Sequence, residues 1–138
     1  MLNNLRKRRI DPALRLALPL LAPLLLALSL SDPGSAAAPD AVARSETHHL
    51  LDYIERSGCD FNRNGRWYRA KDGRAHIEKK YAYLLDKGWV STAEEFIARA
   101  ATQSSMSGTP YQVRCAGARA EPSAQWLREE LLRYRGAR

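Results

Sequence analysis

The sequence predicts an α+β fold, in which a small antiparallel sheet, made of a hairpin and one late strand, packs with about four helices. Three observations lead to this prediction. Four segments repeat apolar residues at helical spacing. One Asn-Gly pair stands between two short runs that contain aromatic residues. The only two cysteines fall in the hairpin and in the late strand, so one disulfide would tie these parts of the sheet together.

The first two helices are expected on either side of the hairpin. The earlier one runs from about 42 to 57, because its large apolar residues share one face, and Gly58 would end it. The later one begins after the hairpin, where Asp72 can accept a hydrogen bond from a free backbone N–H, and it ends at Gly88.

The third and fourth helices follow in the C-terminal half. Ser91 or Thr92 would cap the third helix, since each is followed three residues later by a glutamate, as in a capping box. Residues 102–110 are polar and break helices, so they are expected to form a loop. The fourth helix begins at Ser123, and its many charged residues are expected on an exposed face.

Three strands are expected. The Asn64-Gly65 pair predicts a tight turn between strands at about 59–63 and 66–69, because both residues tolerate positive φ. Residues 111–115 alternate apolar and polar side chains, which is typical of a half-buried strand. Residues 116–122 are interpreted as a linker.

Residues 1–37 have the three parts of a secretory signal peptide. A basic start containing Arg6–Arg9 precedes the uncharged, leucine-rich stretch Leu16–Leu30, and small residues follow up to the expected cleavage point after Ala37. The alternative is a permanent membrane anchor, but the apolar stretch is shorter than the roughly 20 residues that a spanning helix needs. Residues 38–138 are then expected to form a single domain, exported to the periplasm by the general route.

The net charge of the predicted domain argues against nucleic acid as a partner. The whole chain carries a formal net charge of +7. Residues 38–138 keep 17 basic and 13 acidic side chains, a net charge of only +4. This excess is too small to indicate nucleic-acid binding. No nucleic-acid partner is therefore expected, and the membrane is expected to be contacted only through the leader before cleavage.

The two cysteines, Cys59 and Cys115, are expected to form a disulfide, because an even number of cysteines in an exported protein favours pairing. Two buried free thiols or a pair of metal ligands are the alternatives. Neither cysteine belongs to a C-x-x-C pair, and the histidines lack the spacing of metal ligands. No metal or cofactor is therefore expected.

Short motifs run in order through most of residues 57–127. They are Ser57-Gly58-Cys59, Phe61-x-Arg63-Asn64-Gly65-x-Trp67-Tyr68, His76 followed by Lys80-Tyr81, Thr92-x-x-Glu95-Phe96-Ile97, Ser104-Ser105-x-Ser107-Gly108-x-Pro110-Tyr111-x-Val113-x-Cys115, and Trp126-Leu127. Together they resemble the YfeK-like family of small periplasmic proteobacterial proteins, known as domain of unknown function 5329. Ile77 departs from the leucine expected there. The resemblance implies export and paired cysteines, and it implies no catalytic residue.

The hairpin is the first candidate site, because basic and aromatic residues gather around it. Guanidinium groups suit phosphate or carboxylate, and aromatic faces can stack on flat ligands. The alternative is a solvated turn whose arginines pair with nearby acids while the tryptophan joins the core. The candidate residues for an anion or a partner are Arg63, Arg66, Trp67, Tyr68, Arg69 and Arg74.

The second candidate is a polar site made of His76, Ser104, Ser105 and Ser107. A nucleophilic serine needs a base within hydrogen-bond reach and donors for an oxyanion, and Ser105 or Ser107 with His76 would be the pair. The alternative is that the serines stabilise a turn through local hydrogen bonds and that His76 is structural.

These patterns favour an exported periplasmic protein that is a non-catalytic accessory or interaction module. Its partner would be an envelope protein or an anionic component of the envelope. The alternative function is a small hydrolase or transferase that uses the serine and histidine pair.

Overall fold

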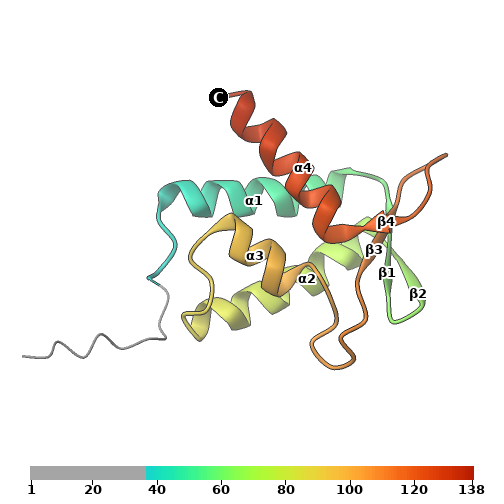
Figure 1. Cartoon of the computed structure of the whole chain (residues 1–138), viewed down its shortest axis with the longest axis horizontal. Helices are drawn as coiled ribbons and strands as arrows, with labels where there is room; N and C mark the ends of the chain where they lie inside the picture. Colours follow the sequence, from blue (N-terminus) through green and yellow to red (C-terminus); the bar gives the residue numbers. More distant parts are fainter. Residues whose placement is uncertain (1–36) are drawn as a thin grey trace, which may run out of the picture. The chain divides into compact units, whose positions relative to one another are not determined.

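The computed structural model describes residues 37–138. Residues 1–36, with nearly all of the predicted leader, lie outside the described residues. Residues 37–138 form four helices and four strands (Figure 1). In chain order they are α1 (Ala41–Arg56), β1 (Asp60–Arg63), β2 (Arg66–Arg69), α2 (Ala70–Asp86), α3 (Ala93–Ala100), β3 (Gln112–Arg114), β4 (Glu121–Pro122) and α4 (Ser123–Gly136).

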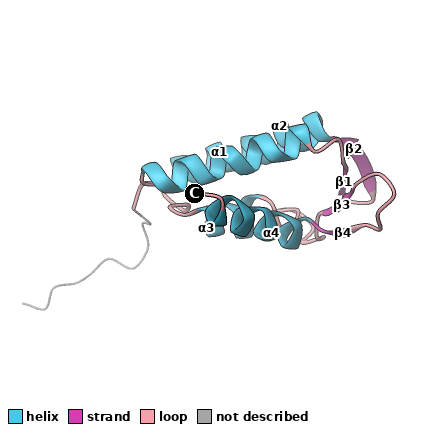
Figure 2. Ribbon diagram, turned by 90° about the horizontal axis from the view of Figure 1, so that it is seen from above, coloured by secondary structure: helices cyan, strands magenta, loops and turns pink. Residues whose placement is uncertain are grey.

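The helices lie in two layers, with α1 and α2 in one and α3 and α4 in the other, and the sheet stands at one end of both (Figure 2). The sheet order is β2-β1-β3-β4, and every neighbouring pair is antiparallel. The predicted α+β class is confirmed. Within residues 37–138 no helix is both long enough and apolar enough to cross a membrane.

The sheet has one strand more than the sequence indicated. The predicted linker at 116–122 ends in β4, where Glu121 pairs with Val113 of β3. The Ser123 N–H also donates to the Tyr111 carbonyl at 3.0 Å, which holds the start of α4 against β3. A strand of two residues that includes Pro122 carries no alternation to detect, and proline is tolerated there because β4 is an edge strand.

The hairpin forms at the predicted turn. Asn64 has φ of 52° and Gly65 has φ of 81°, as the favoured two-residue turn requires. The register pairs Phe61 with Tyr68 and Asn62 with Trp67. The disulfide between Cys59 and Cys115 is present, with the two Cα atoms 4.2 Å apart, and it joins the start of β1 to the end of β3.

One predicted cap is confirmed and one is wrong. The Thr92 side chain accepts from the Glu95 N–H at 3.1 Å, and the Glu95 carboxylate accepts in return from the Ser91 N–H at 2.7 Å. Asp72 does not cap α2, because the helix begins directly after β2 at Ala70, with no side-chain cap. Asp72 lies instead in the first turn, where its negative charge interacts favourably with the helix dipole.

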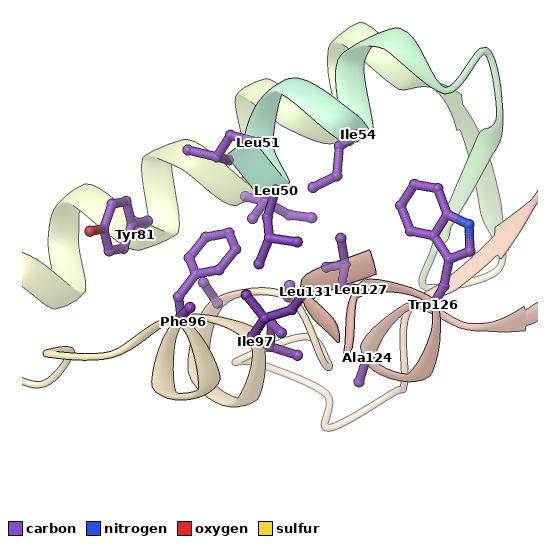
Figure 3. Close-up of a cluster of buried hydrophobic side chains, with 14 of the residues drawn as sticks. Leu50, Leu51, Ile54, Tyr81, Phe96, Ile97, Ala124, Trp126, Leu127 and Leu131 are labelled. Atoms are coloured by element: carbon purple, nitrogen blue, oxygen red, sulfur yellow. The ribbon is translucent and has the colours of Figure 1, made fainter. Parts of the chain in front are cut away.

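The core fills the space between the helix layers (Figure 3). Leu50 and Ile54 of α1 meet Phe96 and Ile97 of α3 there, and all four are fully buried. The Trp126 ring closes the end of the core next to the sheet. It stacks on Tyr53 at 4.4 Å and meets the edge of Phe61 at 5.7 Å between ring centroids.

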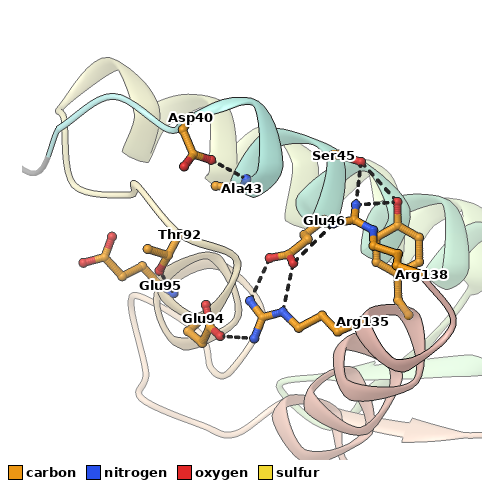
Figure 4. Close-up of polar contacts among 10 residues, drawn as sticks. Asp40, Ala43, Ser45, Glu46, Thr92, Glu94, Glu95, Arg135 and Arg138 are labelled. Carbon is orange, nitrogen blue, oxygen red and sulfur yellow. Dashed lines mark hydrogen bonds and ion pairs between the residues drawn. The ribbon is translucent and has the colours of Figure 1, made fainter.

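Charged residues of α4 fix this helix to its neighbours, and the expectation of an exposed charged face is wrong for one of them, Glu130. The Arg135 guanidinium binds the buried Glu46 of α1 and Glu94 of α3 (Figure 4). Glu130 is only 8% exposed, and its carboxylate lies 2.6 Å from Nε2 of His49. Ion pairs therefore join α4 to both helix layers.

Candidate functional site

The basic and aromatic residues of the hairpin lie on two opposite faces of the sheet. Side chains alternate along a strand, so residues that are adjacent in sequence point to opposite sides. The register places Arg63, Arg66 and Tyr68 on the same face as the buried Phe61. Trp67 lies on the other face, so the sequence cluster is not one continuous patch.

On the inner face, two guanidinium groups gather on one aromatic ring. The Arg63 guanidinium carbon lies 4.8 Å from the centroid of the Tyr68 ring, and that of Arg66 lies 5.6 Å from it. Arg63 also donates to the Tyr68 hydroxyl at 3.3 Å. Such contacts hold the planar guanidinium groups in place while their charge stays available.

On the outer face, Trp67 lies under the Arg114 guanidinium, whose carbon is 4.1 Å from the ring centroid. Arg114 in turn lies 3.6 Å from the Asp60 carboxylate. The half-buried Trp67 therefore belongs neither to the core nor to a free stacking surface. Arg69 is exposed on this same face.

Arg74 does not belong to the candidate site. Its guanidinium lies 3.1 Å from Glu55 of α1 and 2.9 Å from Glu78 of α2. The alternative of ion pairing with nearby acids therefore holds for Arg74, and this residue joins α2 to α1. Asp60, another acid near the hairpin, pairs with Arg114 instead.

His76 lies behind the inner face of the hairpin. Arg63, Tyr68, His76 and Tyr111 line a small hollow of about 20 Å³ together with Asp72 and neighbouring residues of β1 and α2. The His76 Nε2 atom lies 3.0 Å from the Tyr111 hydroxyl. The hairpin and His76, which the sequence analysis predicts as parts of two separate candidate sites, thus line one hollow.

The charged groups that shift the pKa of His76 are all cations. Burial, together with the nearby Arg63, Lys80 and Lys79, lowers the pKa of His76 to about 4. Lys80 donates to the Gln103 carbonyl at 2.7 Å, and burial lowers its pKa as well. His76 is therefore neutral at pH 7, and its Nε2 can accept a hydrogen bond from the Tyr111 hydroxyl.

The three serines have different roles. Ser104 is buried, and its hydroxyl accepts from the Ser107 N–H at 3.3 Å within the turn. The Ser107 hydroxyl donates to the Asn64 side chain at 2.8 Å, which attaches the loop to the hairpin turn. Ser105 is exposed and lines a groove together with His76. No hydrogen bond joins His76 to a serine hydroxyl within residues 37–138.

Several cations near the hairpin and along α2 have no acidic partner. No carboxylate lies within 4.0 Å of their charged nitrogens in the part of the chain that the structure describes. They are Arg63, Arg66, Arg69, Lys71, Lys79 and Lys80. In the same part of the chain, no cluster of three or more histidine, cysteine, aspartate or glutamate side chains could hold a metal ion.

A comparison with known protein families shows which family the chain belongs to. The model of a family of unknown function, DUF5329, matches residues 41–135. The chain belongs to the DUF5329 family. The match covers all of the helices and strands of residues 37–138 except the last residue of α4, so this fold is that of the DUF5329 domain. No curated protein and no solved structure shows significant similarity to the chain.

Sequence reasoning missed two members of the candidate site. The sequence predicts Tyr111 only as part of a strand, and it indicates no functional role for Lys80. The i, i+4 spacing of His76 and Lys80 on one helix could have suggested that they share a face. Nothing local indicates that Tyr111 reaches them, because that contact depends on the segment before β3 lying beside α2.

Proposed function

We propose that this DUF5329 protein is an exported, non-catalytic accessory module of the periplasm, similar to the YfeK-like proteins. In this proposal it binds an anionic component of the cell envelope through the hairpin. The leader-like residues 1–37 and the Cys59–Cys115 disulfide support export, since disulfides persist in oxidising compartments.

The observation that carries the binding function is the set of unpaired arginines at the hairpin. Arg63, Arg66 and Arg69 stand within seven residues of one another without an ion pair in residues 37–138. Arg44, Arg99, Arg119 and Arg128 also lack a carboxylate within 4.0 Å in the described residues, but they are scattered over separate segments, whereas the three hairpin arginines come from one pair of strands. Guanidinium groups that are held by Tyr68 but lack a partner favour a carboxylate or phosphate ligand.

The geometry supports binding more than hydrolysis. His76 bonds to Tyr111 instead of to a serine, and Ser104 and Ser107 are engaged in the turn. A nucleophilic serine would need the histidine within hydrogen-bond reach. Ser105 lines the same groove as His76, but no bond connects them in the described residues.

The test measures retention of the protein on an envelope extract at low salt. The full chain is produced with its leader in an exporting host and purified as that host processes it. Arg66→Glu with Arg69→Glu should lower retention by about tenfold or more, and added salt should weaken wild-type retention, because exposed charges are screened. The control is Arg99→Glu with Arg128→Glu. It makes the same change of charge at exposed arginines of α3 and α4 and should leave retention unchanged.

A protease treatment of the extract separates the sources of the anion. Loss of retention after the treatment identifies an acidic protein, whereas survival identifies phosphate or carboxylate groups of lipid or glycan. If both double variants are retained like the wild type at low salt, the hairpin does not bind an envelope anion and the proposal is wrong.

A further inference from the structure

The C-terminal part of α2 and the segment directly after it expose two large aromatic side chains. Tyr83 is 56% exposed and Trp89 is 43% exposed, and their rings meet edge to face at 6.2 Å. Core-forming aromatics such as Phe96 and Trp126 are at most 6% exposed, so this exposure is not required by the fold. We call the surface formed by Lys79, Tyr83, Lys87 and Trp89 the α2 tip.

Lysines surround these rings. Lys79 and Lys80 line a groove of about 490 Å³ together with Tyr83 and Trp89. The Lys87 ammonium lies 5.6 Å from the Tyr83 ring centroid, and it is also 3.7 Å from the exposed carboxylate of Asp86. The α2 tip therefore combines amphipathic aromatic rings with an excess of positive charge.

This combination matches the chemistry of a bilayer surface. Tryptophan and tyrosine prefer the boundary between acyl chains and headgroups, because each has an apolar body and a polar end. Lysine side chains can lay their apolar stems along that boundary while the ammonium groups meet anionic headgroups.

The path of the chain is a second, independent observation. Ala38 and Pro39 line a hollow together with Leu85, Lys87 and Gly88, so the polypeptide enters the fold next to the α2 tip. The apolar stretch Leu16–Leu30 precedes this point in the sequence. A leader inserted in a membrane would hold this end of the domain close to the bilayer. Cleavage after Ala37 would place a new positively charged amino group there.

We propose that the α2 tip docks on the surface of a bilayer that contains anionic phospholipids. This goes beyond the proposed function, because the exposed rings of the α2 tip lie far along α2 from the hairpin arginines, although the groove beside these rings extends to His76. α2 begins directly after β2 and runs away from the sheet, so the hairpin and the tip lie at its two ends (Figure 1). The domain would rest on the membrane by one end and present its unpaired arginines at the other.

The test measures co-sedimentation with vesicles of phosphatidylcholine alone or with added phosphatidylglycerol, using the full chain as an exporting host processes it. Wild type should bind the anionic vesicles and not the neutral ones. Lys79→Gln and Lys87→Gln should each weaken binding by about fivefold, as expected for a lysine near an anionic surface. Tyr83→Ala with Trp89→Ala should weaken binding at least as much, and Arg66→Glu with Arg69→Glu should leave most of the binding intact.

Quenching of tryptophan fluorescence shows which face of the protein enters the lipid, which a binding affinity does not show. Lipids brominated near the top of the acyl chains should quench the fluorescence of Trp89 in bound wild type. In Trp89→Phe the remaining Trp67 and Trp126 should not be quenched. Persistent quenching in Trp89→Phe would show that another face docks, and the inference would fail.

The two proposals fail separately. If the arginine double variant loses vesicle binding while the aromatic double variant keeps it, the hairpin binds lipid, so the proposed function stands and the docking of the α2 tip is wrong. If wild type binds neither type of vesicle, docking by the α2 tip is again wrong, and retention on the envelope extract still decides the function of the hairpin.

Discussion

Arg135 and Glu46 stand 89 residues apart in the chain, and in the fold the guanidinium of Arg135 contacts both carboxylate oxygens of Glu46, at 2.9 and 2.7 Å (Figure 4). The Glu46 side chain is only 5% exposed while that of Arg135 is 39% exposed, so this pair attaches α4 to α1 and shields the carboxylate rather than the guanidinium from water. Both hydrogen-bonded carboxylates, Glu46 and Glu94, raise the pKa of Arg135.

Arg135→Ala should destabilise the protein by about 2 kcal/mol, because it leaves the Glu46 carboxylate buried without its main partner. Urea unfolding measures the effect. Replacing both residues by leucine should recover much of the loss, since no charge then stays buried. Arg128→Ala, at an exposed arginine of the same helix, should change stability by less than about 0.5 kcal/mol. Equal effects of the two alanine variants would contradict the role given to this pair.

The disulfide should supply a large part of the stability. Cys59→Ala with Cys115→Ala opens a link between residues 56 apart in sequence. The chain-entropy model then predicts a loss of about 4 kcal/mol. Urea unfolding of the variant and of reduced wild type should agree. Two alkylatable thiols in the unreduced, denatured wild type would show that the bond does not form in the exported protein.

Acid should weaken the fold partly through His76. The pKa of this histidine is lowered to about 4 by burial and by neighbouring cations, while the unfolded chain has the ordinary value of about 6.5. The unfolded state therefore binds a proton more readily between these values, and stability falls as the pH drops from about 6.5 toward 4. His76→Gln should lose less stability than wild type over this interval, as measured by urea midpoints at several pH values. Parallel pH profiles would contradict the assignment.

Gly73 should resist substitution although it lies inside a helix. A Cβ atom there would stand 3.0 Å from the Phe61 ring, and Phe61 is itself only 5% exposed and packed against Trp126. Gly73→Ala should therefore lower the thermal midpoint, despite the helix preference of alanine. In Gly136→Ala nothing lies within 4 Å of the new atom, so the same change should be neutral or stabilising. A higher midpoint for Gly73→Ala would show that Phe61 can yield.

Local signals were sufficient for most of the fold. Asn64-Gly65 predicted the turn because both residues accept positive φ, and Thr92 with Glu95 predicted the start of α3 because each side chain bonds to a backbone N–H of its neighbours. The prediction that Asp72 caps α2 is wrong, because α2 follows β2 directly and therefore begins before this residue, its best capping candidate.

The candidate site was only partly predictable. Arg63, Arg69 and Arg74 look equivalent in sequence, but strand alternation and the approach of α1 give them three different environments. Tyr111 joins His76 only because the tertiary fold brings the segment before β3 beside α2.

The sequence alone determined where the helices and the hairpin form, and that two cysteines were available to link them, since short-range backbone preferences and side-chain periodicity decide these features. Only the tertiary structure decided which cations remain without a partner and which aromatic rings stay exposed. The physical reason is that ion pairs and burial depend on residues brought together from distant parts of the chain, as Glu46 is with Arg135.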